Sequence, residues 1–154
     1  MAKIPKSAKK VFEGILFSVW QYPQKQFDGS TKTFELWGRH DIVVIFPTQW
    51  DRIFVWYEKQ PHFDDFRLNF FGWMQDKHDD PLDCAKAELL EETWMVSHDW
   101  ELWSSYDVAS KMDWKISFYI ARNVRKVAEQ SLDPGGEIIE VRSFSFDEFV
   151  DMII

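Results

Sequence analysis

Three glutamates lie close together on a stretch of sequence that favours a helix. The stretch contains Glu88, Glu91 and Glu92, and the helical rotation of about 100° per residue places the three carboxylates within an arc of roughly 100°. No basic residue stands one turn from Glu91 or Glu92 to neutralise it, and like charges at this spacing cost a few tenths of a kcal/mol per pair. A hard divalent cation binds oxygen ligands and would offset this repulsion. The cluster therefore predicts a metal site.

A solvated acidic surface is the alternative interpretation of these glutamates. For this spacing alone it is the more common explanation, because charged helix faces are frequent. The neighbouring residues favour the site, since Ala85 and Leu89 belong to an apolar stripe that would face a core and the glutamates flank that stripe. Carboxylates at the edge of a buried face suit a binding site better than a solubilising surface.

The chain around this helix predicts many strands and a second helix. Asp80-Pro81 supplies an N-cap followed by the proline favoured in the first turn, so we expect the helix to span about 81–94. Ser145 and Glu148 match a capping box that opens a C-terminal helix. These elements predict an α+β fold in which helices cover a mixed sheet. Apolar runs and alternation predict strands at 10–22, 33–37, 42–46, 52–57, 68–73, 100–106, 114–121 and 137–144.

The segment from Gly72 to Met95 resembles the motif of the Nudix hydrolase family. In that motif a glycine precedes a helix that carries Arg-Glu-apolar-x-Glu-Glu-x-Gly-apolar, and this chain has Ala-Glu-Leu-Leu-Glu-Glu-Thr-Trp-Met at 87–95. The later Glu-Ile-Ile-Glu-Val at 137–141 is most similar to the branch that hydrolyses ADP-ribose and nucleoside-diphosphate sugars. The resemblance spans about 12–153 and implies a Nudix-like α/β/α sandwich, with a central motif helix and a C-terminal helix.

The resemblance also implies roles for particular residues. It assigns Glu88, Glu91 and Glu92 to the binding of Mg²⁺ or Mn²⁺, and Glu88, Glu92 and Glu137 to catalysis of water attack on a diphosphate. Glu140 is the alternative to Glu137 as the additional acidic residue, and either could also be an ordinary glutamate at the edge of a strand. The implied substrate is a nucleoside diphosphate linked to another group.

Three positions depart from the family motif. Ala87 stands where the family has arginine, and Lys86, one residue away, is rotated by about 100° on the helix and replaces it imperfectly. Trp94 replaces the second glycine, and a left-handed backbone there would cost about 1 kcal/mol for a non-glycine residue. The first half of the motif fits with one extra residue after Gly72, which puts Asp79 at a glutamate position. These losses leave open a catalytically weak or inactive nucleotide-binding domain.

Composition limits the other possibilities. The 154 residues carry a net charge of −8, which argues against nucleic-acid binding as the main activity. Cys84 is the single cysteine, and no apolar run approaches the length of a membrane span. We therefore expect a cytoplasmic protein without a membrane segment. We expect a flexible basic segment at 1–10 and one domain at 11–154.

Two interaction surfaces are also predicted. By analogy with the sugar-nucleotide branch, we expect a homodimer formed through the strands of about 11–37. A third functional hypothesis treats Trp73, Trp94 and Trp103 as exposed aromatic residues at a protein interface.

Overall fold

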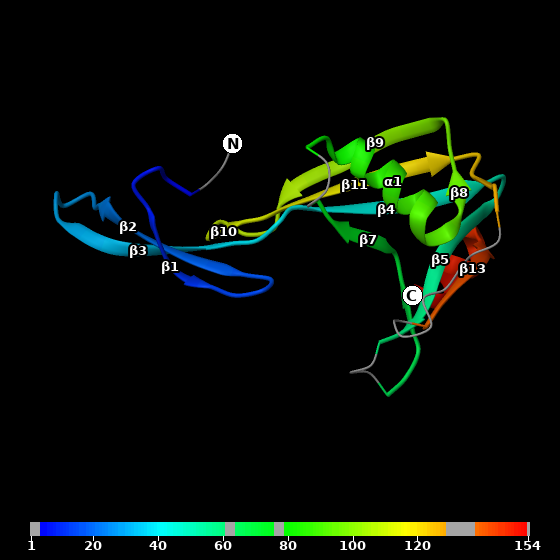
Figure 1. The fold of residues 1–154 in the computed structure, drawn as a ribbon, viewed down its shortest axis with the longest axis horizontal. Coiled ribbons are helices and arrows are strands. Elements are labelled where there is room, and N and C mark those ends of the chain that lie inside the picture. The colour runs from blue at the N-terminus through cyan, green and yellow to red at the C-terminus, as the bar shows by residue number, and fades with distance from the viewer. Residues whose placement is uncertain (1–3, 61–63, 76–78, 129–137, 154) are drawn as a thin grey trace.

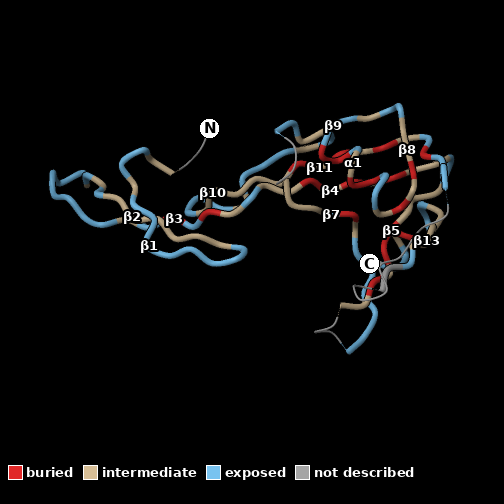
Figure 2. Tube along the Cα trace, in the orientation of Figure 1, coloured by how far each residue is buried: buried red, intermediate tan, exposed pale blue. Residues whose placement is uncertain are grey.

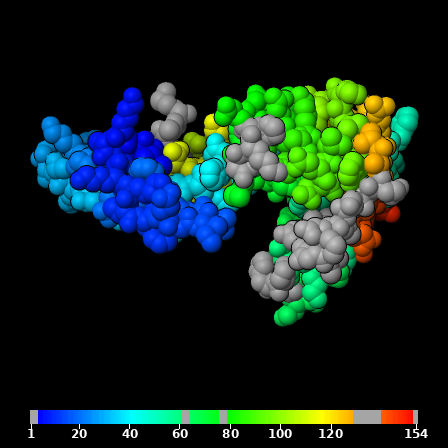
Figure 3. Space-filling view, in the orientation of Figure 1, coloured from blue at the N-terminus to red at the C-terminus, as the bar shows by residue number. Residues whose placement is uncertain are grey.

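The computed structural model describes residues 4–60, 64–75, 79–128 and 138–153. It has an α+β fold, as the sequence predicts, with mixed sheets and two helices. Figure 1 shows two parts, an arm made by the first three strands and a body that holds both helices. In the space-filling view the arm stands clear of most of the body (Figure 3). No helix in the described part of the chain is long and apolar enough to cross a membrane.

The arm is an antiparallel sheet of β1 (Lys9–Glu13), β2 (Ser18–Lys25) and β3 (Thr31–Gly38). We predicted one strand at 10–22, and this prediction is wrong. The chain reverses between β1 and β2, where the Gly14 N–H donates to the Phe17 carbonyl at 2.8 Å. Lys9 and Lys10, which we expected in a flexible segment, lie in β1. The short β10 (Met112–Asp113) pairs in parallel with β3 and connects the arm to the body.

The body is built on a sheet with the strand order β13-β5-β4-β11-β9. Its centre is the parallel pair of β4 and β11, in which Ile42 lies opposite Ile116. β6 pairs with β5 and β7 pairs with β4, while β8 and β12 form a separate two-stranded sheet. The strands are β4 (Ile42–Gln49), β5 (Arg52–Lys59), β6 (Arg67–Asn69), β7 (Phe71–Met74), β8 (Met95–Val96), β9 (Asp99–Asp107), β11 (Lys115–Arg122), β12 (Arg125–Lys126) and β13 (Ile138–Ser145).

Two of the predicted strands have different boundaries. The predicted strand at 68–73 breaks at Phe70, where the chain leaves β5 and joins β4. β4 does not end at Pro47 but continues to Gln49. β7 pairs with β4 only as far as Ile45. Pro47 lies opposite Ala121 of β11 but beyond the end of the pairing with β7, so its missing N–H disturbs no pairing with β7.

The core lies between the sheet and α1 (Pro81–Thr93). On β4 the fully buried residues alternate with half-buried ones, and Val43 and Ile45 meet Ala85 and Leu89 of α1 in one cluster (Figure 2). The predicted apolar stripe of the helix is therefore confirmed. α2 (Phe146–Ile153) packs against β13 and β5. Its predicted capping box is also confirmed, because Ser145 N–H donates to the Glu148 carboxylate at 2.7 Å and Glu148 N–H donates to Ser145 Oγ at 3.2 Å.

Candidate active site

The start of α1 is fixed by the cap that the sequence predicts. The Asp80 carboxylate accepts hydrogen bonds from the backbone N–H groups of Leu82 at 2.8 Å and Asp83 at 3.2 Å. These bonds satisfy two donors that a helix N-terminus would otherwise leave unpaired. Beneath the helix, burial raises the pKa of Tyr119, and the negative charge of Asp80 raises it further. The Asp80 cap therefore fixes the residue at which α1 begins, and with it the positions of the glutamates along the helix.

The end of α1 is closed by Trp94 in a left-handed conformation, with φ 55° and ψ 29°. Its N–H donates to the Leu90 carbonyl at 2.9 Å. Thr93, which is buried, adds a side-chain clamp, since its hydroxyl donates to the Leu89 carbonyl and accepts from Met95 N–H at 3.1 Å. The chain thus keeps the tight exit that glycine provides in the Nudix motif, although tryptophan stands there.

The three glutamates of α1 lie in different environments. Glu88 is buried with 5% of its surface exposed, Glu92 is half-buried and Glu91 is exposed. Glu88 and Glu92 are one turn apart and lie next to the buried residues Leu89 and Thr93. The exposure of the three glutamates to solvent therefore increases from Glu88 through Glu92 to Glu91.

A cavity of about 620 Å³ brings Glu92 together with residues from five strands, β4, β5, β6, β7 and β11. Gly72 on β7 also lines it, so the structure brings together two of the predicted site residues. A Cβ at Gly72 would meet Val44 Cγ2 at an ordinary 3.7 Å, so packing alone does not require glycine there. The side chains that carry its polarity are Arg39, Glu58, Gln60, Asn69 and Glu92.

Arg39 is the one basic side chain among the described residues that line this cavity. Its guanidinium lies over the ring of Trp114 at 4.4 Å and near that of Phe17 at 5.1 Å. Its Nε is buried and has no hydrogen-bond partner in the described part of the chain. A buried N–H without a partner costs about 1–3 kcal/mol, and an anionic ligand could satisfy it.

The other predicted residues that the structure describes, Glu88, Glu91, Asp79 and Lys86, do not line the cavity. Asp79 is exposed, and its backbone carbonyl accepts a hydrogen bond from Gln75 Nε2 at 2.7 Å. Lys86 is exposed and pairs with Asp83 at 3.3 Å. Glu137 lies outside the described residues, and its role stays a prediction. Glu140 on β13 bonds Arg142 at 2.9 Å, and this hydrogen bond lowers the pKa of the Glu140 carboxyl.

The described residues contain no group of three or more His, Cys, Asp or Glu side chains placed to hold a metal ion. The donor chemistry nevertheless fits a hard cation, because the glutamates offer carboxylate oxygens. Mg²⁺ in particular is often bound through one or two carboxylates, with water and substrate phosphates as its other ligands. Metal binding by Glu88, Glu91 and Glu92 stays a prediction.

Sequence reasoning missed Arg39, Trp56, Glu58 and Asn69 as residues of the cavity. Arg39 lies in the connection between β3 and β4, Trp56 and Glu58 lie on β5, and Asn69 is the last residue of β6. None of them belongs to the motif helix. Glu58 had one available signal, a carboxylate directly after the strongly apolar segment 53–57. The pairing of Trp56 with Asn69 across β5 and β6 could be known only from the fold.

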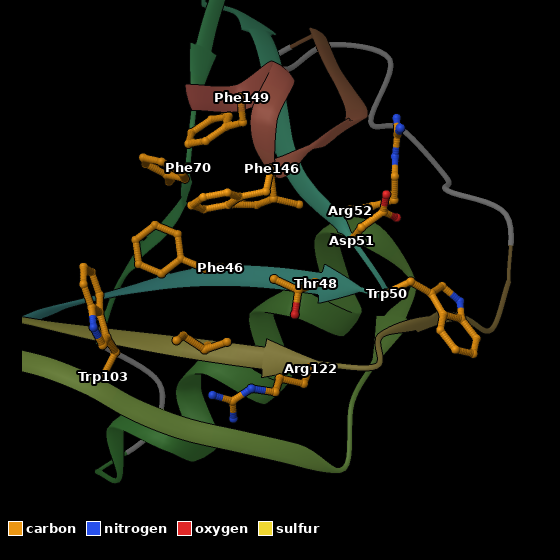
Figure 4. A pocket seen from close by; sticks show the side chains of 12 residues that line it. Phe46, Thr48, Trp50, Asp51, Arg52, Phe70, Trp103, Arg122, Phe146 and Phe149 are labelled. Carbon is orange, nitrogen blue, oxygen red and sulfur yellow. The ribbon is translucent and has the colours of Figure 1, made fainter. Parts of the chain in front are cut away.

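A second cavity of about 640 Å³ lies beside α2 and holds none of the predicted site residues. Figure 4 shows its aromatic walls, with Phe70, Phe146 and Phe149 grouped above Phe46 and Trp103 at one end. Trp103 is exposed, whereas Trp73 and Trp94 are half-buried. Of the three tryptophans proposed to form an interface, only Trp103 is therefore exposed.

Comparison with solved structures shows the class of fold. The chain is similar to a protein whose structure is titled "Crystal structure of ADP compounds hydrolase", with a TM-score of 0.75 over 96% of this chain and 80% of that one. The two are 16% identical in sequence. No protein-family profile matches the chain, and no curated protein matches it in sequence. The fold is α+β and consistent with the Nudix fold of this neighbour.

Proposed function

We propose that this protein is a hydrolase that cleaves the diphosphate linkage of a nucleoside diphosphate joined to another group, such as ADP-ribose or a nucleotide sugar. The observation that carries the proposal is the position of Glu92. It stands on the helix of the Nudix-like segment, is half-buried, and shares a 620 Å³ cavity with the cation of Arg39. The fold shared with an ADP compounds hydrolase is the second support.

In this proposal Glu88, Glu91 and Glu92 hold Mg²⁺ or Mn²⁺, which when bound would neutralise diphosphate charge and lower the pKa of a water molecule. Arg39 binds the diphosphate within the same cavity, where its charge and its unpartnered Nε–H favour an anion. Glu88 and Glu92 orient the attacking water, and Glu137 accepts its proton while the bond between the attacked phosphorus and the bridging oxygen breaks. The half-buried position of Glu92 limits competing water and strengthens these electrostatic interactions.

The test compares the wild-type protein with Glu92→Gln on ADP-ribose, nucleotide sugars and dinucleoside polyphosphates in the presence of Mg²⁺. We expect cleavage by the wild type and a loss of at least a hundredfold in Glu92→Gln. Glu101→Gln is the control, because Glu101 is an exposed carboxylate on β9, at the far edge of the sheet from β5. Absence of cleavage of every compound, by all three proteins alike, would contradict the proposal.

A second candidate function is nucleotide binding without efficient turnover. It is favoured by the loss of the motif arginine, which Ala87 replaces. Lys86 does not stand in for that arginine, because its ammonium group pairs with Asp83. The last turn of α1 contains no basic residue, and supporting groups of this kind are worth about ten- to a hundredfold. Calorimetry separates the two, since nucleotide binding that persists without metal, with no product formed, supports this candidate.

We also propose that the protein works as a homodimer joined through its arm, in a reducing compartment such as the cytoplasm. The arm exposes apolar side chains that a monomer leaves in water, including Phe12 and Leu16, and Ile15 is fully exposed. A monomeric mass in light scattering would contradict the dimer. If a dimer is found, Phe12→Glu should shift it toward monomer.

A further inference from the structure

Two polar side chains on β5 point into the cavity that Glu92 lines. Trp56 and Glu58 are two residues apart on one strand, so they occupy the same face. Both are buried, with 5% and 6% of their surfaces exposed, and both line the cavity. Burying a polar group has a free-energy cost that hydrogen bonds must offset. The hydrogen bonds that these two side chains make, and those that they lack, therefore indicate which kind of ligand group the cavity can bind.

The Trp56 indole N–H has no hydrogen-bond partner among the residues that the structure describes, although it is fully buried. The ring cannot easily turn to find one, because it is held between Phe71, at 4.9 Å between ring centroids, and Trp73, at 4.7 Å. An indole N–H only donates. The cavity therefore presents a fixed donor that lacks an acceptor.

Glu58 presents the complementary acceptor. Its Oε1 accepts one hydrogen bond, from Asn69 Nδ2 at 3.1 Å. Asn69 is held in place because it lies directly opposite Trp56 in the β5–β6 pair. A carboxylate has about four acceptor positions. The bond from Asn69 thus orients the Glu58 carboxylate and leaves further acceptor capacity for a ligand.

A ligand group that satisfies both side chains must accept from Trp56 and donate to Glu58. A phosphate fails this requirement, because it only accepts and the Glu58 carboxylate repels it. A sugar hydroxyl meets the requirement, since it donates one hydrogen bond and accepts others. Arg39 supplies the cation for a diphosphate within the same cavity. The polar lining is therefore divided between a part for anions and a part for hydroxyl groups.

We propose that Glu58 and Trp56 are specificity-determining residues that bind the hydroxyl groups of the sugar attached beyond the diphosphate. The inference rests on the proposed function and narrows the substrate class to nucleoside-diphosphate sugars. Asn69 is a positioning residue that acts through Glu58. A nucleoside diphosphate without the second sugar leaves the Trp56 N–H and the Glu58 carboxylate unsatisfied. The protein consequently discriminates against it.

Calorimetry with ADP-ribose and ADP tests this proposal, because the two ligands differ by the terminal ribose. The titrations use the full chain, once in EDTA and once with Ca²⁺. We expect the wild type to bind ADP-ribose at least tenfold more tightly than ADP. Glu58→Gln should weaken ADP-ribose binding about ten- to a hundredfold and Trp56→Phe several-fold, both with ADP affinity unchanged. Glu101→Gln is the matched control and should bind as the wild type does.

The outcomes separate the two proposals. Binding of neither ligand by the wild type would overturn the proposed function together with this inference. Equal binding of ADP and ADP-ribose, or an equal loss of both in Glu58→Gln, would overturn the inference alone, and the equal loss would assign Glu58 to the adenosine part. Unchanged ADP affinity in each variant also shows that it is folded. Trp56→Phe provides an independent test if Glu58→Gln does not fold.

Discussion

Replacement of Thr93 by valine tests whether the side-chain clamp holds the end of α1. Valine has nearly the same shape and a similar helix propensity, so the change removes two hydrogen bonds and little else. The Met95 N–H donates a hydrogen bond to Thr93 Oγ1 at 3.1 Å. In the variant this N–H would remain buried without a partner, at a cost of about 1–3 kcal/mol. The lost bond to the Leu89 carbonyl adds about 1 kcal/mol. The extra buried methyl group returns about 0.8 kcal/mol, so we expect a net loss of about 1–3 kcal/mol.

Urea denaturation measures this change in the free energy of unfolding, with an unchanged m-value. The midpoint temperature of thermal unfolding should fall by about 2–4 °C for each kcal/mol lost from the free energy of unfolding. Hydrogen exchange of the Met95 amide should accelerate locally, which a general loss of packing would not single out. Thr33→Val is the control, because Thr33 is exposed on β3 and such changes usually stay within about 0.5 kcal/mol. A Thr93→Val protein as stable as this control would refute the reasoning.

Three further predictions concern stability. Trp50 has φ 56° and is 90% exposed. Trp50→Asn should raise the free energy of unfolding, measured in urea, by up to about 1 kcal/mol. Asparagine tolerates the left-handed region, and the exposed tryptophan loses little packing when it is replaced. Phe71→Ala should lower the same quantity by about 3–5 kcal/mol, because Phe71 is fully buried; a loss below 1 kcal/mol would contradict this. The Ser145 N–H lowers the pKa of the Glu148 carboxyl, so the stabilisation is present above the unfolded pKa and is lost as pH falls through the folded one. Acid unfolding curves of wild type and Glu148→Gln should therefore converge at low pH.

Local chemistry made much of the fold predictable. Asp80 and Pro81 fixed the start of α1, the Ser145 and Glu148 pair fixed the start of α2, and the apolar stripe of α1 identified its buried face. The errors came where tertiary structure decides. The two halves on either side of the strand break at Phe70 separate because β6 pairs with β5 whereas β7 pairs with β4.

The site was predictable only on its helical side. Glu88, Glu91 and Glu92 could be grouped because the helix has a known period, and Glu92 does line the cavity. Arg39 follows the end of β3 and Glu58 lies on β5, and the neighbours of both depend on the topology of the sheets. Their distance in sequence from α1 carries no signal of proximity. Burial of Glu58 depends on its pairing with β6, which sequence spacing could not supply.

The parallel pairing of β4 with β11 has a consequence for the folding of the chain. Ile42 and Ile116 are opposite one another at the centre of the sheet, and the whole of α1 lies between them in sequence. The cost of closing so long a loop precedes the gain from the pairing, and contacts of this kind slow folding. During synthesis β4 must therefore wait for β11 with one edge unpaired. We expect this interval to be the time at which the protein is most prone to aggregate.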